Sequence, residues 1–533
     1  MISVLIFSWW FSISSHIDPF LAGARHHAEA PRPTSSLSSP EIYYVDSKAG
    51  NDTNSGTSPQ KAWKSLAMVN NHVFRPGDRL LFKAGTLYEG QLAPKGKGLK
   101  NRPIVIDGYG KGVKPEIRGR GAMPAALWLH NTEYWEICNL CISNEGNTRV
   151  AGRYGVLVSL KDFGTAHHIE LKGLEVRDVN GSLVKKEGGG AGIVASNEGE
   201  QVPSRFDGLL IANCTIRNTA RNGILINGNW MRNKWYPSRG VVIRKNLLEG
   251  VPGDGIVPIG CDSALIEYNV MRNCPAILPD GEAAAGIWPW SCDHTLIQYN
   301  EVSDHHAPWD GQGFDSDWNC RNTIIQYNYS HDNEGGFLLI CNDGSAHMPQ
   351  SVGNTGSIVR YNLSVNDGFR TGGKHAGFSP SIHVVGSTKN SMVYNNVIFI
   401  TGRTANMDST LVQMGNWNGL PDSTFFFNNI FYVKGVVNYD LNLATHVFFK
   451  NNLYFGNHLE RPEDSDAVIA DPLFVKVPEK RFDGWEATKG FMLKEGSPAR
   501  GKGKPIINKA FADFFGNPVS PLQAPSIGIH QAR

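Results

Sequence analysis

The sequence predicts an all-β solenoid, a stack of coils, from three observations in its middle third. Four segments share one layout, in which a glycine precedes a short strand-forming run. In three of them a second apolar run ends in Tyr-Asn, at Asn269, Asn300 and Asn328. Similarity that recurs every 20–50 residues is typical of stacked repeats. The segments are GDGIVPIGCDSALIEYN, AGIWPWSCDHTLIQYN, QGFDSDWNCRNTIIQYN and GGFLLICND, with Gly255, Gly286, Gly313 and Gly336.

Asparagine (once glycine) precedes an apolar strand residue throughout residues 130–460, about once per coil. An asparagine at a sharp turn can bond backbone groups of the next coil, so we expect these side chains to form a structural ladder. The positions are Asn139, Gly173, Asn213, Asn246, Asn269, Asn300, Asn328, Asn362, Asn396, Asn429 and Asn452.

Strand alternation assigns the two faces, because successive side chains point to opposite sides. After Gly313, Phe314 and Ser316 are predicted to face inward, and Asp315 and Asp317 outward. One coil earlier, Trp288 and Trp290 take the outward positions. Aligning Gly336 with Gly313 places Leu338 and Ile340 outward one coil later.

The composition is that of a globular protein, with 533 residues, 41% hydrophobic and 19% charged. A net charge of +2 gives no basic field for nucleic acid, and no apolar run beyond the N-terminus is long enough to span a membrane. Residues 1–24 are predicted to be a signal peptide and 25–40 a linker, which indicates a secreted or periplasmic protein. A wrongly assigned start ahead of a disordered tail is the alternative.

The eight cysteines are too scattered for a disulfide framework. Cys138 and Cys141 would point to opposite faces of one strand, which disfavours a redox or zinc site. Cys261, Cys292 and Cys320 recur at one place in successive coils, and we expect them to be small core residues rather than disulfides or metal ligands.

The chain opens with a strand (42–45), a Gly/Asn loop, a helix over about 62–71 and a turn. The helix is expected to cap the open end of the solenoid. The order YYV (43–45), GND (50–52), SGT (55–57), PGD (76–78) and FKAG (82–85) resembles the opening of secreted right-handed parallel β-helix proteins of the pectin-lyase-like superfamily. ADPLF (470–474) and DFFG (513–516) resemble their closing segment.

This resemblance implies one domain, a right-handed parallel β-helix, that cleaves polysaccharides by hydrolysis or by β-elimination. Its parts would be residues 41–125 (first strand, capping helix and first coils), 126–460 (β-helix with the active groove) and 461–533 (closing segment). The family holds many activities, so fold alone does not give function. The polygalacturonase signatures NTD, GHG and RIK are not found as such.

Asp315 and Asp317 are the predicted catalytic residues. Two residues apart on one strand face, they should lie about 6.5–7 Å apart. That separation suits two carboxyl groups that flank a glycosidic bond. Trp288 and Trp290, about 4.8 Å away on the neighbouring strand, would form a sugar-stacking platform. The alternative for the aspartates is a solvated strand face.

Asp310 and Glu334 precede two successive strands and are expected to assist catalysis. His383 is predicted at the outward position of Asp315 two coils further on, and His305 and His306 lie in the loop before Asp310. All three histidines are candidate substrate-binding residues. Turn-shaping for Asp310 and an ordinary loop role for His305 and His306 remain alternatives.

Two other functions stay open. In a lyase, Asp315 and Asp317 would bind Ca²⁺, while Arg370 and Lys374 would supply the base and the substrate clamp. A non-catalytic carbohydrate-binding β-helix would carry aromatic residues without clustered acids, which the DSD cluster disfavours. Hydrolysis is the preferred prediction, with a polysaccharide or oligosaccharide as substrate, no cofactor, no membrane span and a monomeric state.

Overall fold

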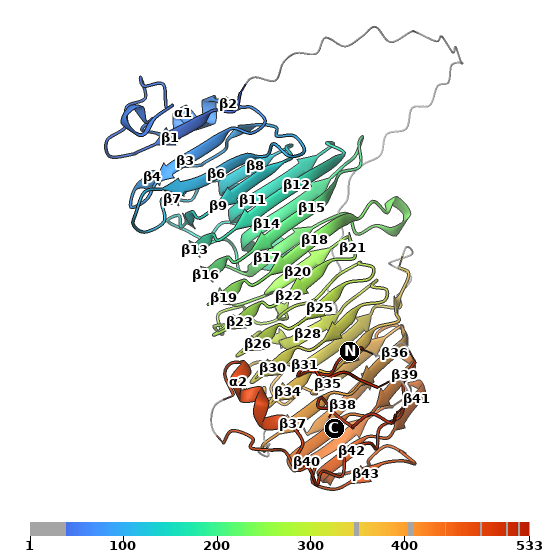
Figure 1. Cartoon of the computed structure of the whole chain (residues 1–533). Coiled ribbons are helices and arrows are strands. Elements are labelled where there is room, and N and C mark those ends of the chain that lie inside the picture. Colours follow the sequence, from blue (N-terminus) through green and yellow to red (C-terminus); the bar gives the residue numbers. More distant parts are fainter. Residues whose placement is uncertain are drawn as a thin grey trace, which may run out of the picture.

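The structure is a computed structural model that describes residues 39–531, except for 346–350, 403–408, 443, 480–481, 508–509 and 521–522. The predicted signal peptide and almost all of the predicted linker lie outside the described residues. The chain winds into an elongated stack of coils, with α1 (Leu66–Asn71) at the N-terminal end and α2 (Trp485–Thr488) beside β30 (Tyr329–His331) and β34 (Leu363–Val365) (Figure 1). No helix among the described residues is long and apolar enough to cross a membrane.

Long parallel sheets run the length of the stack, because each coil adds one strand to each of them. The first sheet comprises β1 (Ile42–Val45), β3 (Arg79–Lys83), β6 (Ile104–Tyr109), β9 (Trp135–Cys138), β12 (Thr165–Lys172), β15 (Arg205–Ala212), β18 (Ser238–Arg244), β22 (Leu265–Glu267), β25 (Leu296–Gln298), β29 (Ile324–Gln326), β33 (Ile358–Arg360), β36 (Thr388–Tyr394), β39 (Asp422–Phe427) and β41 (Thr445–Lys450), with β21 (Cys261–Asp262) and β32 (Asn354–Thr355) paired at its side.

The second sheet comprises β4 (Leu87–Glu89), β7 (Glu116–Arg118), β10 (Cys141–Asn144), β13 (Glu175–Val179), β16 (Thr215–Thr219), β19 (Leu247–Glu249), β23 (Val270–Arg272), β26 (Glu301–Ser303), β30 (Tyr329–His331), β34 (Leu363–Val365), β37 (Val397–Ile400), β40 (Ile430–Asp440), β42 (Leu453–His458) and β43 (Val468–Ile469).

The third sheet carries the acidic segment. It comprises β8 (Ala125–His130), β11 (Arg153–Lys161), β14 (Gly190–Glu198), β17 (Asn222–Asn227), β20 (Ile256–Ile259), β28 (Gln312–Ser316), β31 (Gly336–Asn342), β35 (Ile382–Gly386) and β38 (Thr410–Gly415). Single bridges through Ile287 join β20 to β28. Two short pairs, β2 (Val73–Phe74) with β5 (Lys95–Gly96) and β24 (Ala283–Ala284) with β27 (Trp309–Asp310), lie outside the long sheets.

The asparagine ladder is present from Asn246 to Asn452. Each side-chain amide donates to the carbonyl oxygen of the next one, as from Asn269 to Asn300 at 2.9 Å. Asn139 and Asn213 are instead exposed and lie outside the ladder. The backbone N–H of Cys214 donates to Oδ1 of Asn246 at 2.9 Å. The amides satisfy turn backbone groups that would otherwise be buried without partners.

Two further predictions are wrong in detail. The N-terminal helix starts at Leu66 rather than near Ala62, because Trp63 pairs with the first strand through an N–H bond to Tyr44. Leu338 and Ile340 face the core and are fully buried. Phe314 aligns with Leu338, so the true register differs by one residue from the glycine alignment, which exchanges the two faces.

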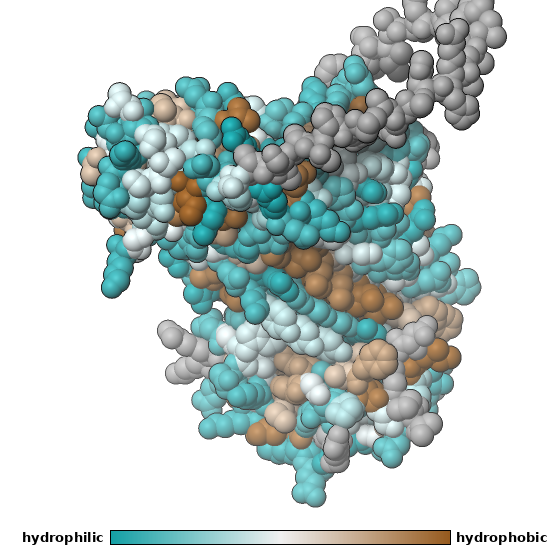
Figure 2. Space-filling view, turned by 45° about the horizontal axis from the view of Figure 1, so that its top comes forward, coloured by the Kyte–Doolittle hydropathy of each residue, from teal (hydrophilic) through white to brown (hydrophobic). Residues whose placement is uncertain are grey.

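All eight cysteines are buried and unpaired, which confirms the predicted absence of disulfides and the core positions of Cys261, Cys292 and Cys320. The face of the molecule shown in Figure 2 is largely hydrophilic, with a band of apolar surface across its middle. Outward-facing apolar residues of the third sheet form one cluster around Leu157 and Val194 and another around Val257 and Trp288.

Candidate active site

Backbone pairing fixes which residues lie beside the acidic strand. The N–H of Asp315 donates to the carbonyl of Ile287 at 3.2 Å, and that of Asp317 to Pro289 at 3.3 Å. Trp288 and Trp290 therefore occupy the neighbouring outward positions. On the other side, Asp315 aligns with Leu339, and Leu339 with His383.

Asp310 lies at the edge of the same strand segment, in β27. It aligns with Ala284 of β24, and the next residue, Gly311, donates to the Ala284 carbonyl at 2.7 Å. Its backbone is left-handed, with φ +59°. The guanidinium of Arg370 donates to the backbone carbonyl of Asp310 at 2.5 Å, and this bond holds the turn in place.

Solvent access separates the three aspartates. Asp315 is only 2% exposed, whereas Asp310 and Asp317 are half-buried and keep surface. One carboxylate oxygen of Asp315 is buried without a hydrogen-bond partner among the described residues. Asp310 and Asp317 are thus the two acids of the segment that a ligand can reach.

Burial, and the charge of nearby carboxylates, raise the pKa of all three carboxyl groups. Burial, followed by the charge of Asp317, raises the pKa of Asp310 to about 7. Burial, then Asp310 and Asp317, raises the pKa of Asp315 well above its usual value. Burial also raises the pKa of Asp317, although hydrogen bonds from Cys341 and the Trp318 N–H oppose it.

Asp317 is anchored through one oxygen. Its Oδ1 accepts from the Cys341 thiol at 2.8 Å and from the Trp318 N–H at 2.5 Å. Its Oδ2 forms no hydrogen bond with any of the described residues. Oδ2 is therefore the oxygen that a substrate can approach.

A fourth carboxylate, Asp254, lies beneath the strand and was not singled out from the sequence. It is 1% exposed and accepts hydrogen bonds from the Arg221 guanidinium and, at 3.1 Å, from the Trp288 indole N–H. Although its burial acts in the opposite direction, Lys185 and Arg221 lower its pKa. We call Asp254, Asp310, Asp315 and Asp317 the carboxylate cluster.

Two half-buried tryptophans lie next to acids of the carboxylate cluster. Trp290, beside Asp317, packs against Trp230 and Trp318 with ring centroids 5.4 Å and 5.0 Å away. Trp309, beside Asp310, lies 3.8 Å from the ring of His375 and 5.4 Å from that of Phe378. Trp290 and Trp309 are half-buried, and the part of each ring that stays accessible suits the apolar face of a sugar.

Trp288 is placed differently from Trp290. It is 6% exposed, and its indole points to Asp254. It therefore packs between Asp254 and Lys185 rather than offering a free ring face.

The remaining predicted residues surround Asp310. Glu334 lies one coil away and accepts a 2.9 Å hydrogen bond from His306, and this bond raises the pKa of the histidine. His305 is fully buried and bonds the Gly253 carbonyl at 2.9 Å, and burial lowers its pKa to about 4, which keeps the ring neutral. His383 packs edge-on against Phe378 at 5.6 Å.

Arg370 and Lys374 lie in different environments. Arg370 is 2% exposed and donates to the carbonyls of Ala307 and Phe378. Lys374 is exposed in the loop that follows. Arg370 thus braces the turn at Asp310, and the structure does not bring the two basic residues together on the strand that carries Asp315.

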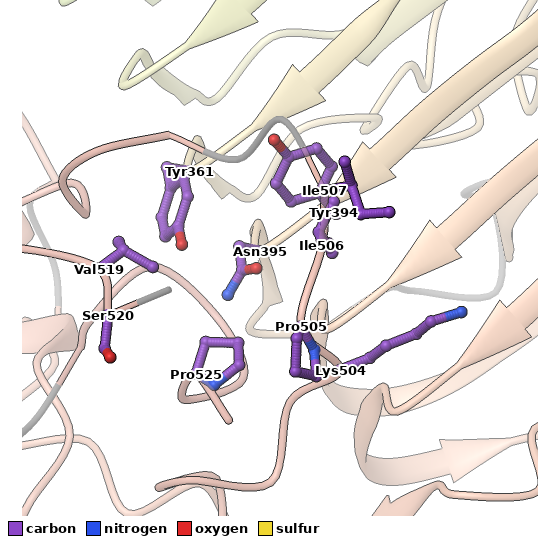
Figure 3. A pocket seen from close by; sticks show the side chains of 10 residues that line it. All are labelled: Tyr361, Tyr394, Asn395, Lys504, Pro505, Ile506, Ile507, Val519, Ser520 and Pro525. Atoms are coloured by element: carbon purple, nitrogen blue, oxygen red, sulfur yellow. The ribbon is translucent and has the colours of Figure 1, made fainter. Parts of the chain in front are cut away.

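A separate cavity of about 300 Å³ lies near the C-terminal segment, between Tyr361, Tyr394 and Lys504 (Figure 3). Asn395 on its wall is tied to the backbone of Ser526 and Gly528. None of its lining residues belongs to the carboxylate cluster.

The chain is similar to known β-helix proteins. The family model of the right handed beta helix region matches residues 191–398. Lacto-N-biosidase of Bifidobacterium longum subsp. longum is 26% identical over 549 residues, which covers 85% of this chain and 33% of that protein. The chain thus spans about a third of the length of this curated relative.

Two solved structures add to this similarity. The GH136 lacto-N-biosidase from Eubacterium ramulus has a TM-score of 0.58 and 27% identity, covering 71% of this chain and 68% of that one. XylC in complex with xylose has a TM-score of 0.52 at 13% identity, covers 92% and 98%, and supports the fold alone. The long parallel sheets, the internal asparagine ladder and these similarities together show that the chain folds as a right-handed parallel β-helix.

Proposed function

We propose that the protein is a glycoside hydrolase in which Asp310 and Asp317 are the two catalytic carboxyl groups. The observation that carries this proposal is the pairing of two half-buried acids in one cluster, where the pKa of Asp310 is raised to about 7. A glycosidase needs one protonated and one ionised carboxyl group on either side of the scissile bond.

Asp310 is the proposed general acid. A carboxyl group with a pKa near neutrality keeps its proton at working pH and can still release it in the transition state. It would transfer this proton to the glycosidic oxygen as the bond to the anomeric carbon breaks, so that the leaving sugar departs as an alcohol. Arg370 and the β24–β27 pairing hold its backbone in place.

Asp317 is the proposed nucleophile or general base. The thiol of Cys341 and the N–H of Trp318 both donate to Oδ1, which favours the ionised form. Oδ2 would then attack the anomeric carbon, or remove a proton from a water that does so. The two routes give retained or inverted product, and NMR of the first-formed anomer distinguishes them.

Asp315 takes a different role from the one predicted from the sequence. It is 2% exposed, lies between the two other acids along the strand and carries an unpartnered oxygen. We assign it as a protonated carboxylic acid that keeps a further negative charge out of the cluster. Its neutral form lowers the repulsion that ionised Asp317 experiences.

The substrate proposed first is an oligosaccharide from which lacto-N-biose is released. Similarity to two lacto-N-biosidases, at 26% and 27% identity, supports this choice. The half-buried Trp290 and Trp309 would hold sugar rings on either side of the bond. An aryl lacto-N-bioside and the matching natural oligosaccharide are therefore the first substrates to test.

The test is a digestion with and without EDTA, followed by reducing-end formation and by ultraviolet absorbance of an unsaturated product. Hydrolysis predicts reducing ends without new absorbance and without an effect of EDTA. Absorbance that EDTA abolishes would contradict the proposal and favour a Ca²⁺-dependent lyase. The buried position of Arg370 disfavours that lyase, because its guanidinium already binds backbone carbonyls.

Export remains a proposal that rests on the N-terminal sequence. Residues 1–24 would be removed from a secreted or periplasmic enzyme that acts as a monomer, without a cofactor. N-terminal sequencing of the exported protein and light scattering would test cleavage and the monomeric state.

A further inference from the structure

Lys185 brings a positive charge to the carboxylate cluster from a distant part of the chain. It begins a short 3-10 turn, Lys185–Glu187, between β13 and β14. In the third sheet β14 pairs with β17, and β17 with β20, whose coil carries Asp254. The loop therefore reaches across coils to arrive at the cluster.

The position of this loop is fixed by packing. Leu183 packs against Leu278, Ala284 and Ala307, and Ala284 is the residue aligned with Asp310. The backbone N–H of Lys185 donates to the Glu282 carboxylate at 2.9 Å. The loop is thus attached to β24, which pairs with Asp310, and to the segment at Ala307 that leads into Asp310.

The ammonium group faces the cluster. Lys185 Nζ lies 3.9 Å from Oδ2 of Asp254 and 5.0 Å from the centroid of the Trp288 ring. Trp288 stands beside Asp315, and the Lys185 side chain is still 43% exposed. The positive charge of Lys185 therefore lies near the acids, and its side chain is accessible from the surface where a substrate would bind.

The neighbouring cations are already engaged. Arg221 is fully buried and donates to Asp254, Glu282 and the Ala283 carbonyl. Arg370 donates to backbone carbonyls. Among these three cations near the cluster, Lys185 has the side chain that stays exposed to solvent.

We propose that Lys185 is a positioning residue for the hydrolysis, whose ammonium balances the charge of the carboxylate cluster so that one acid is ionised while its partner keeps a proton. This inference rests on the proposed function. In support, Lys185 lowers the pKa of Asp310, Asp315 and Asp317, against the burial that raises each of them. Without this charge both catalytic groups would ionise at higher pH.

Charged and titratable groups from every packed element surround Asp310, Asp315 and Asp317. They are Lys185 from the β13–β14 loop, Arg221 from the β16–β17 turn, Asp254 before β20, Glu282 before β24, His305 and His306 before β27, Glu334 before β31, Cys341 of β31 and Arg370 after β34.

The test compares the pH profile of kcat/KM for Lys185→Met, Lys185→Arg and wild type. Methionine keeps the long apolar stem over Trp288 but removes the charge, so both limbs of the profile should move to higher pH by about 0.5–1 unit. Arginine should restore the wild-type profile. Lys186→Met, which removes the adjacent exposed lysine, should leave the profile unchanged.

A second readout does not depend on activity. Infrared difference spectra follow the band of protonated carboxylic acids, which should persist to higher pH in Lys185→Met than in wild type. Unchanged infrared titration and an unchanged kcat/KM profile would overturn the inference, as would a uniform loss of activity that arginine does not rescue. Asp310→Asn and Asp317→Asn, measured in parallel, separate the outcomes: if they stay active, the proposed function itself fails.

Discussion

The thiol of Cys341 lies 2.8 Å from Oδ1 of Asp317 and comes from the next strand of the third sheet. Cys341 is 3% exposed, and burial raises the pKa of its thiol well above the usual value, so the sulfur keeps its proton to donate. A buried cysteine that would otherwise serve as a small core residue thereby orients the proposed nucleophile.

The first prediction concerns this bond. Cys341→Ala should lower kcat/KM by about 10–100-fold, because a hydrogen bond to a charged group is lost. The acidic limb of the pH profile should also move up, since the bond from Cys341 lowers the pKa of Asp317. Cys341→Ser keeps a donor and should retain most activity. Equal kinetics for the alanine variant and wild type would remove Cys341 from the mechanism.

The second prediction separates the two tryptophans that the sequence grouped together. Trp290→Ala should raise KM by about 5–50-fold, because an exposed ring face that stacks on sugar is lost. Trp288→Phe should instead lower the thermal unfolding midpoint, because it leaves Asp254 without its 3.1 Å indole bond. Steady-state kinetics and calorimetry of both variants check this, and an unchanged KM for Trp290→Ala would refute the stacking role.

The third prediction tests the asparagine ladder. Asn300→Ala should destabilise the fold by about 2–4 kcal/mol, because buried carbonyls such as that of Ile266 lose their donor. Asn213→Gly is the matched control: Asn213 is exposed, lies outside the ladder and has φ +54°, which glycine accepts. Urea unfolding should show a change of under about 0.5 kcal/mol for the control. Equal destabilisation of both variants would contradict the ladder.

The fourth prediction concerns pH and stability. His331 is fully buried between Glu301 and Asp332; burial lowers its pKa, but the two carboxylates outweigh it and raise the pKa to about 9. Because the folded pKa exceeds the unfolded value of about 6.5, this stabilisation is complete below pH 6.5 and is lost as pH rises towards 9. Glu301 also accepts the Gly484 N–H, which ties down the segment before α2.

Unfolding midpoints measured across this pH range check the fourth prediction. Wild type should lose stability between about pH 6.5 and pH 9, and His331→Gln should be less stable at low pH and lose much less across that window. Identical pH dependence of the two proteins would show that His331 does not contribute.

The repeats predicted the fold well because each coil repeats one pattern of glycine, strand and asparagine. The error at Leu338 shows the limit of that pattern. The backbone pairs Gly336 with Gln312, so the glycine that opens this segment does not align with Gly313. A shift of one residue is enough to exchange the faces.

Strand alternation alone was enough to find the acidic strand, but it could not predict how much of each acidic side chain is exposed to solvent. Asp315 points outward and is nevertheless 2% exposed. The residues that surround the cluster come from loops whose paths no periodicity encodes: Lys185 from residues 180–189, Trp230 from residues 228–237 and His375 from residues 371–378. One weak indication of Asp254 was present in the sequence, because this residue directly precedes the aligned Gly255. Only its contacts with Trp288 and Arg221 show that it belongs to the carboxylate cluster.

The most direct test of the account is the activity of Asp310→Asn and Asp317→Asn on two substrates that differ only in leaving group. With a sugar leaving group, both variants should lose about 10²–10⁴-fold in kcat/KM. With an activated aryl leaving group, Asp310→Asn should recover most of its activity, because departure no longer needs a proton, whereas Asp317→Asn should stay inactive. If Asp310→Asn shows wild-type rates on the sugar substrate, or if only Asp315→Asn abolishes cleavage, the assignment of the catalytic pair is wrong.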